Sequence, residues 1–156
     1  MAIREIRKFE DEVLRKKCKT VEVVDDHVRQ LLNDLADTLY ATPNSAGLAA
    51  NQVGLLRRLV VIDVGEGLMK LVNPEIVEME GEQVVIEGCL SFPDIWGKVK
   101  RPERVKVRAL NENGEEITIE SEEELLTKCL CHEIDHLNGE VFVDKAIGFV
   151  KIEDEA

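Results

Sequence analysis

The sequence predicts an α+β fold, with small antiparallel or mixed β-sheets packed around a long C-terminal helix and a second helix near the N-terminus. Two observations indicate this class. Apolar residues recur at helical spacing in one segment near each end of the chain. Between these segments, short runs rich in Val and Ile are separated by Gly, Pro and Asn, as is typical of strands joined by turns.

The N-terminal helix is expected at residues 25–41. Its buried face is indicated by apolar residues three or four positions apart, namely Val28, Leu31, Leu32, Leu35 and Leu39. Asp25 or Asp26 suits the N-cap, because a carboxylate there accepts a hydrogen bond from a free backbone N–H of the first turn. The segment Pro43-Asn44-Ser45 should end the helix.

Strands are expected in the middle of the chain. Three short runs qualify, at residues 58–63, 70–73 and 83–86. Residues 105–110 alternate between the two faces of a further strand. Asn113-Gly114 then indicates a hairpin, and the alternation continues through Ile117 and Ile119.

The C-terminal helix is expected between Ser121 and Asn138. Ser121 followed by Glu124 has the pattern of a capping box, and Asn138-Gly139 is a stop signal. At about 100° per residue, one sector of this helix collects Leu125, Cys129, His132, Glu133 and His136. We expect that sector to be buried, so its polar side chains must have partners.

Composition limits the classes of protein that the chain can represent. Its 156 residues suit one domain, and no apolar run approaches the roughly 20 residues that span a bilayer. The first residues do not resemble a signal peptide, so a cytoplasmic location is expected. The net charge of −12 opposes non-specific binding to nucleic acid or anionic membranes. The basic stretch at 98–108 is either a solvated face or a rim beside a pocket for an anionic group.

The segment 132–136 reads His-Glu-Ile-Asp-His, which is the H-E-x-x-H pattern. On a helix, His132 and His136 lie one above the other, so both imidazoles can bind one divalent metal ion. Glu133 then reaches the water at the metal as general acid–base. The C-terminal helix is therefore predicted to bind metal, and residues 1–156 to form a single metallohydrolase domain.

A catalytic metal site also needs a third protein ligand. Phe142 stands where an extended version of the pattern has a third histidine, and Glu140 and Asp144 are only nominal candidates. Upstream, His27 lies in the polar start of the first helix. Cys89 is the better candidate, because it directly follows a strand and a glycine that lets the backbone turn.

Three segments together resemble the signatures of the peptide deformylase family. Residues 45–52, SAGLAANQ, resemble G-x-G-x-A-A-x-Q, while residues 87–91 read EGCLS and residues 132–136 read HEIDH. The similarity extends from about residue 14 to residue 144. Ser45 departs from the pattern by replacing the leading glycine, and it would strain the loop if that position needed a positive φ.

The resemblance implies an enzyme that removes the formyl group from N-formylmethionyl nascent chains and releases formate. It implies one divalent metal ion, with Fe²⁺ favoured and Zn²⁺, Ni²⁺ or Co²⁺ also compatible with the ligands. The matching ligands are Cys89, His132 and His136. Glu133 matches the acid–base, and the Gln52 amide and the Leu90 backbone N–H match the donors to the oxyanion.

An apolar pocket should hold the methionine side chain of the substrate. Its expected walls are Gly47, Leu48, Leu125 and Cys129. Arg101 is expected to orient either a substrate carbonyl or the Glu87 carboxylate. The short acidic tail at 151–156 does not resemble the basic tail that docks some family members on the ribosome, so any ribosome contact should be transient.

Two other functions stay open at this point. A metal-dependent peptidase that cuts internal bonds is opposed by Phe142 and by the absence of an obvious ligand after His136. A peptide-binding protein without catalysis would have lost a ligand, the base or an oxyanion donor, and the sequence retains all of them.

Overall fold

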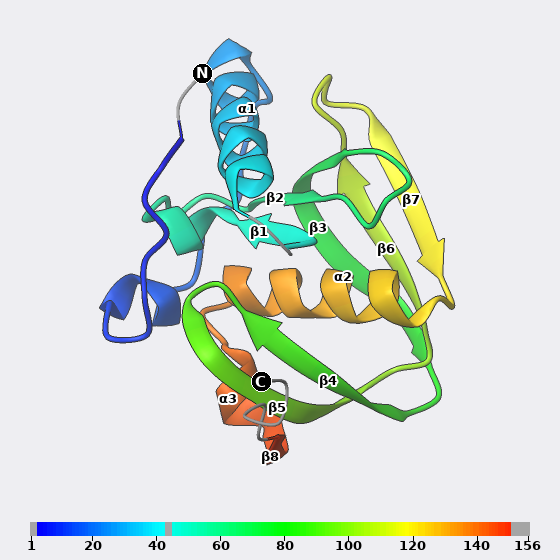
Figure 1. Ribbon diagram of the computed structural model, residues 1–156. Helices are drawn as coiled ribbons and strands as arrows, with labels where there is room; N and C mark the ends of the chain where they lie inside the picture. Colours follow the sequence, from blue (N-terminus) through cyan, green and yellow to red (C-terminus); the bar gives the residue numbers. More distant parts are fainter. Residues whose placement is uncertain (1–2, 43–44, 151–156) are drawn as a thin grey trace.

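Helix α2 (Glu124–Leu137) lies between two antiparallel β-sheets, as Figure 1 shows. The computed structural model describes residues 3–42 and 45–150. The larger sheet has the strand order β1-β2-β3-β6-β7, with β1 (Gly47–Ala49), β2 (Leu59–Ile62), β3 (Met69–Glu80), β6 (Arg104–Leu110) and β7 (Glu116–Ser121). The smaller has the order β4-β5-β8, with β4 (Gln83–Cys89), β5 (Phe92–Arg101) and β8 (Ala146–Val150). The α+β class predicted from the sequence is therefore confirmed.

Helix α1 (Asp26–Ala41) covers the face of the larger sheet opposite α2. The remaining helical elements are short: the 3₁₀ helices η1 (Glu12–Arg15) and η2 (Ala50–Val53) and the one-turn helix α3 (Phe142–Lys145). No helix in the described ranges is long and apolar enough to cross a membrane.

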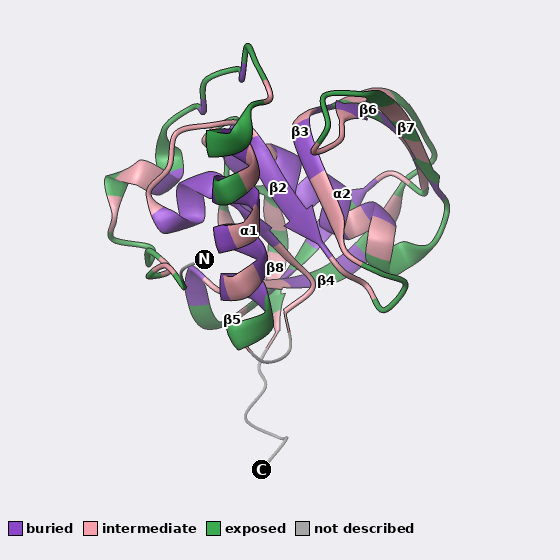
Figure 2. Ribbon diagram, turned by 90° about the horizontal axis from the view of Figure 1, so that it is seen from above, coloured by how far each residue is buried: buried purple, intermediate pink, exposed green. Residues whose placement is uncertain are grey.

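Strand β2 explains why residues 59–62, within the predicted run, are continuously apolar. Val60 and Ile62 pack into the cluster that contains the buried face of α2, whereas Leu59 and Val61 pack into the cluster of α1. Figure 2 shows this strand buried along its length beneath α1. A strand covered on both faces has no solvent side, so its side chains need not alternate in polarity.

Both ends of α1 are held by side chains. The Asp25 carboxylate accepts a hydrogen bond from the backbone N–H of Val28 at 3.0 Å, which confirms the expected N-cap. Pro43 and Asn44, expected to break the helix, lie outside the described residues. Ser45 donates from its hydroxyl to the carbonyls of Thr42 at 2.7 Å and Leu39 at 3.2 Å. It thereby satisfies acceptors at the end of the helix.

The N-terminus of α2 differs from the expectation. The helix begins at Glu124, and its N-cap, Glu123, makes no side-chain capping hydrogen bond. Ser121 is instead the last residue of β7, with its hydroxyl 2.7 Å from that of Thr127. The predicted capping box was wrong because the strand continues to Ser121 and postpones the start of the helix.

Several strands were longer or less visible in the sequence than expected. The hairpin of β6 and β7 is confirmed, with Gly114 at a φ of 79° in its turn. Strand β3 continues past residue 73 to Glu80. Strands β1, β5 and β8 were not predicted. In β5, Arg101 occupies an inward position that would ordinarily be apolar, so the alternation was hidden among basic residues.

Asp25 offers a test of the capping geometry. Asp25→Ala should lower the free energy of unfolding by about 1 kcal/mol, because the N–H of Val28 loses its acceptor. Asp26→Ala is the matched control: its side chain is 99% exposed and pairs with Arg29 on the surface, so its loss should cost under about 0.5 kcal/mol. Chemical denaturation of both variants measures the difference, and equal losses would contradict the assignment.

Candidate active site and metal centre

Three potential ligand atoms converge where the end of β4 meets α2. Cys89 Sγ lies 3.3 Å from His136 Nε2, and His136 Nε2 lies 3.2 Å from His132 Nε2. The ligand atoms of these three residues all lie within 4.8 Å of one another. The two histidines are one helical turn apart, as the sequence spacing required, while Cys89 comes from another part of the chain.

The two short separations, 3.3 Å between Cys89 Sγ and His136 Nε2 and 3.2 Å between the two Nε2 atoms, fit ligands of one divalent ion. An ion with tetrahedral bonds of about 2.0–2.3 Å places neighbouring ligand atoms roughly 3.3–3.6 Å apart. The tautomer also fits: His132 Nδ1 lies 2.8 Å from Glu87 Oε1, so the proton resides on Nδ1 and the lone pair of Nε2 faces the other ligands. A thiolate with two imidazoles suits iron, zinc, nickel or cobalt.

A buried charge network fixes the orientation of His132. Arg101 donates to both oxygens of Glu87, at 2.6 and 2.8 Å, and to Asp135 at 2.7 Å. Burial alone would raise the pKa of Glu87, but the hydrogen bonds from Arg101 and His132 lower it to about 2. Glu87 is therefore an ionised acceptor for His132. Of the two roles considered for Arg101, the structure matches the orientation of Glu87.

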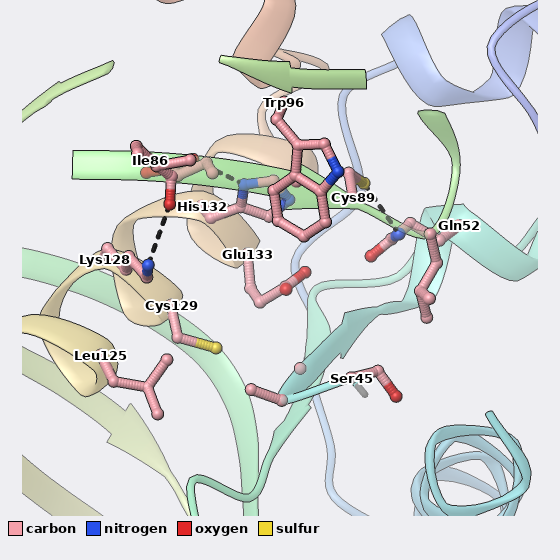
Figure 3. Close-up of a pocket in the computed structure, with 15 residues that line it drawn as sticks. Ser45, Gln52, Ile86, Cys89, Trp96, Leu125, Lys128, Cys129, His132 and Glu133 are labelled. Atoms are coloured by element: carbon pink, nitrogen blue, oxygen red, sulfur yellow. Dashed lines mark hydrogen bonds and ion pairs between the residues drawn. The ribbon is translucent and has the colours of Figure 1, made fainter. Parts of the chain in front are cut away.

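Glu133 extends into the pocket beside this centre, as Figure 3 shows. Its side chain is buried, and among the described residues its Oε1 has no hydrogen-bond partner. Burial raises the pKa of Glu133 to about 7. A carboxyl group with a pKa near neutrality can both accept and return a proton, which is what acid–base catalysis requires.

Gly47 lies against this carboxylate. A Cβ atom at position 47 would lie 2.8 Å from Glu133 Oε2 and 2.8 Å from Cys129 Sγ, closer than real contacts allow. The second glycine of the first signature is thus explained by close approach of the β1 backbone to the Glu133 carboxylate. Ser45, the departure from that signature, causes no strain of the kind considered: among the described residues only Asn73 and Asp94 combine a side chain with a positive φ.

Gln52 has two distinct contacts through its amide. Its Oε1 accepts from the backbone N–H of Ala49 at 2.9 Å, which fixes the orientation of the amide because an N–H can only donate. The Nε2 therefore faces the other way, 3.5 Å from Cys89 Sγ (Figure 3) and 3.3 Å from the Ser91 hydroxyl. Gln52 both ties the loop and presents a donor at the edge of the metal centre.

The pocket contains most of the residues singled out from the sequence. Its walls include Gly47, Gln52, Glu87, Cys89, Leu90, Leu125, Cys129, His132 and Glu133. Sequence reasoning missed Ile86, Trp96 and Lys128, which also line it. Lys128 could have been found, because it lies four positions before His132 on the same helix face. Trp96 belongs to β5, which was not predicted.

One expected wall of the pocket, Leu48, is not among the residues that line it. Leu48 is fully buried on the opposite face of β1, packed in the cluster of α1, because side chains alternate along a strand. Leu125 lines the pocket as expected, but it is 41% exposed rather than buried, because it stands in the first turn of α2. The basic residues at 98–108, all of them described, do not line the pocket; Arg101 is absorbed by the charge network and Arg104 pairs with Glu78 and Glu80.

The other candidate ligands are elsewhere. Asp144 pairs with Arg15 at 2.6 Å, Glu140 pairs with Lys145 at 3.2 Å, and His27 is exposed. Phe142 is buried, and its ring packs against that of His132 with centroids 5.8 Å apart. It supports a histidine from behind, in a position where an extended motif would have supplied another ligand.

Comparison with known proteins identifies the family. The sequence model of the polypeptide deformylase family matches residues 3–151. The chain belongs to the peptide deformylase family. It is 61% identical to a peptide deformylase of Acetivibrio thermocellus over 99% of this chain and 89% of that protein. It is 59% identical to peptide deformylase 2 of Clostridium acetobutylicum over 97% of this chain and 100% of that protein.

Solved structures agree with this assignment. The crystal structure of peptide deformylase from Thermotoga maritima superposes with a TM-score of 0.89 at 39% identity, covering 94% of this chain and 99% of that one. The chain is therefore a metal-dependent deformylase that hydrolyses the N-terminal formyl group of formyl-methionyl polypeptides. The family resemblance noted in the sequence is confirmed.

The contact of Gly47 with Glu133 can be tested in this deformylase. Gly47→Ala should displace the carboxylate and lower kcat roughly 10²-fold, as small misplacements of catalytic groups do. Gly148→Ala is the control, because a Cβ there meets no atom within 4 Å. Steady-state kinetics with metal content measured on the same samples gives the answer. Undiminished turnover in Gly47→Ala would contradict the prediction. It would show that the backbone around residue 47 shifts to accommodate the Cβ while the Glu133 carboxylate stays in place.

Proposed function

We propose that Cys89, His132 and His136 hold one divalent metal ion, at which this deformylase cleaves the formyl group from nascent chains. The observation that carries the proposal is the convergence of one thiol sulfur and two imidazole Nε2 atoms within 4.8 Å, beside a buried carboxylate. Fe²⁺ is the ion that the family resemblance favours, and the same ligands suit Zn²⁺, Ni²⁺ or Co²⁺.

The side chains around the ion divide the chemistry among them. When bound, the ion supplies positive charge that polarises the formyl carbonyl and favours ionisation of the attacking water. Glu133 takes the proton from that water and returns it to the amine that leaves, which its pKa of about 7 allows. Gln52 Nε2 and the backbone N–H of Leu90 donate to the oxyanion that develops on the formyl oxygen.

The methionine side chain of the substrate would occupy the apolar part of the pocket. Its walls there are Ile86, Leu125, Cys129 and the ring of Trp96, with the stem of Lys128 between them. Burial of a methionine side chain supplies roughly 1.5–3 kcal/mol, enough to favour it over a small side chain at the same position. Gly47 leaves room for the Glu133 carboxylate at the edge of this pocket, because a Cβ at position 47 would meet it at 2.8 Å.

The same function indicates where the enzyme works. We propose that it acts in the cytoplasm on nascent chains, as one domain spanning residues 1–156, without a membrane or a specific nucleic acid as partner. A net charge of −12 supports only a transient contact with the ribosome, because RNA would repel most of this surface. The acidic tail at 151–156, on which the ribosome expectation rested, lies outside the described residues.

Removal of the thiolate tests the metal centre. Cys89→Ala should lose the metal and, with it, the hydrolysis of formyl-Met-Ala. Cys18→Ala is the matched control: this thiol is buried away from the centre, and burial raises its pKa to about 11, so it should change neither property. Metal analysis and the deformylase assay are run on both. Full metal occupancy in Cys89→Ala would refute the proposed ligand set.

Glu133→Gln separates the acid–base from the ligands. The variant keeps the shape of the side chain and the three ligands, so metal content should stay near wild type. Turnover should fall by roughly 10²–10⁴-fold, because the amide cannot accept the proton of the water. Loss of metal along with activity would mean that Glu133 is itself a ligand.

Gln52→Ala tests the oxyanion donor. Because the amide also ties Ala49, we expect a loss of about 1 kcal/mol in stability as well as a roughly 10²–10³-fold fall in kcat per metal-loaded site. Ser91→Ala is the control, since it removes a partner of Nε2 but leaves the donor in place. A destabilised Gln52→Ala variant with turnover equal to that of Ser91→Ala would leave Gln52 only its structural role.

A further inference from the structure

Asn51 lies at the contact between η2 and the C-terminal end of α2. Its side chain is fully buried, and its Nδ2 donates to the backbone carbonyl of His136. A carbonyl can only accept, so the amide nitrogen must face it and the Oδ1 is turned elsewhere. Asn51 therefore holds the backbone of a proposed metal ligand while keeping a second polar atom for another partner.

Two buried polar atoms at this contact are unpaired. Among the described residues, neither Asn51 Oδ1 nor His136 Nδ1 has a hydrogen-bond partner, and both side chains are fully buried. A buried polar atom without a partner costs about 1–3 kcal/mol. Two such atoms on residues already bonded to each other are expected to be satisfied together.

The chemistry of the imidazole makes the two atoms complementary. His136 Nε2 faces Cys89 and His132, so a metal there would take the lone pair of Nε2. The proton of a neutral imidazole must then reside on Nδ1, which becomes a donor. Asn51 Oδ1 is an acceptor. The other histidine already follows this arrangement, since His132 Nδ1 donates to Glu87.

The remaining unpaired buried atoms do not offer an equivalent partner. Among the described residues these are Arg104 Nη1, which lacks a hydrogen bond but lies 3.7 Å from Glu120 Oε1, and Glu133 Oε1, which faces the pocket. Arg104 is a donor and cannot serve a second donor. Glu133 is needed by the water and the leaving amine. Asn51 does not line the pocket, and among the described residues its side chain forms no hydrogen bond besides the one to His136.

We propose that Asn51 is the positioning residue of His136, holding its backbone through Nδ2 and accepting its Nδ1 proton at Oδ1, directly or across one buried water. This inference rests on the proposed role of His136 as a ligand. It gives the two histidines unlike partners: His132 has the carboxylate of Glu87, and His136 has a neutral amide. Two neighbouring residues of the first signature thus contact proposed metal ligands: the Gln52 amide contacts Cys89, and the Asn51 amide contacts His136.

The test compares metal affinity in two variants of the full-length protein. Asn51→Leu has similar volume but no polar atom, and it should bind Zn²⁺ about 10–100-fold more weakly in competition with a chelator. Arg58→Met is the control. Arg58 Nη1 donates to the carbonyl of Leu137 at 3.0 Å, so its loss also frees the end of α2 but leaves the imidazole of His136 untouched. Its Zn²⁺ affinity should equal that of wild type.

A second variant and a spectroscopic readout separate positioning from general destabilisation. Asn51→Asp keeps an acceptor, so it should recover part of the affinity lost in Asn51→Leu although it also loses the donor to His136. In Zn²⁺-loaded wild type, ring ¹H–¹⁵N spectra should show a proton on His136 Nδ1 that exchanges slowly with water, and faster in Asn51→Leu.

Two results would overturn the inference. One is a Zn²⁺ affinity of Asn51→Leu equal to that of Arg58→Met. The other is a ring ¹H–¹⁵N spectrum of Zn²⁺-loaded wild type in which His136 Nδ1 carries no proton or exchanges its proton rapidly with water. This result does not depend on whether any variant folds. A separate variant tests the proposed metal site itself. If His136 is not a ligand, His136→Ala should still bind the metal as wild type does.

Discussion

A buried ion-pair network centred on Arg101 and Glu87 connects the smaller sheet to the helix that carries both histidines. Glu87 in β4 accepts from Arg101 in β5, and Arg101 continues to Asp135 in α2. Removing three charges from water is costly, and the cost is offset here because each charge has a partner of opposite sign within 2.8 Å. The remaining acceptor capacity of Glu87 is used by His132. The position of the metal centre thus depends on an interaction that lies just behind it.

Around this pair, the three signatures have separable physical roles. The second supplies Cys89 and the carboxylate that orients His132. The third supplies two imidazoles and Glu133 from one face of α2. The first contributes no proposed metal ligand. Its Gly47 leaves room for the Glu133 carboxylate, and its Asn51 and Gln52 amides contact His136 and Cys89.

The sequence was most informative where the determining interaction is local. The extent of α1, its cap at Asp25 and the spacing of the two histidines all depend on residues within one or two turns. It was least informative where distant segments decide. Ser121 looks like a helix cap until β6 pairs with it and extends β7. Leu48 looks like a pocket wall until β2 and α1 determine which face of β1 is buried. Strand β5 was missed because Arg101 occupies one of its inward positions. A buried charge is tolerated there only because partners from other elements bind it, and the local sequence does not show those partners.

Cys89 and His136 are 47 residues apart in the chain and meet only when β4 has packed against α2. An ion held by this set would bind the native chain far better than the unfolded one, so its chemical potential enters the folding equilibrium directly. At a free concentration 100 times its dissociation constant, the ion would add about 2.7 kcal/mol to the free energy of unfolding. The thermal midpoint of the protein then depends on the free metal concentration of the buffer as well as on the sequence. A partly loaded sample would contain two populations, metal-bound and metal-free, that unfold at different temperatures.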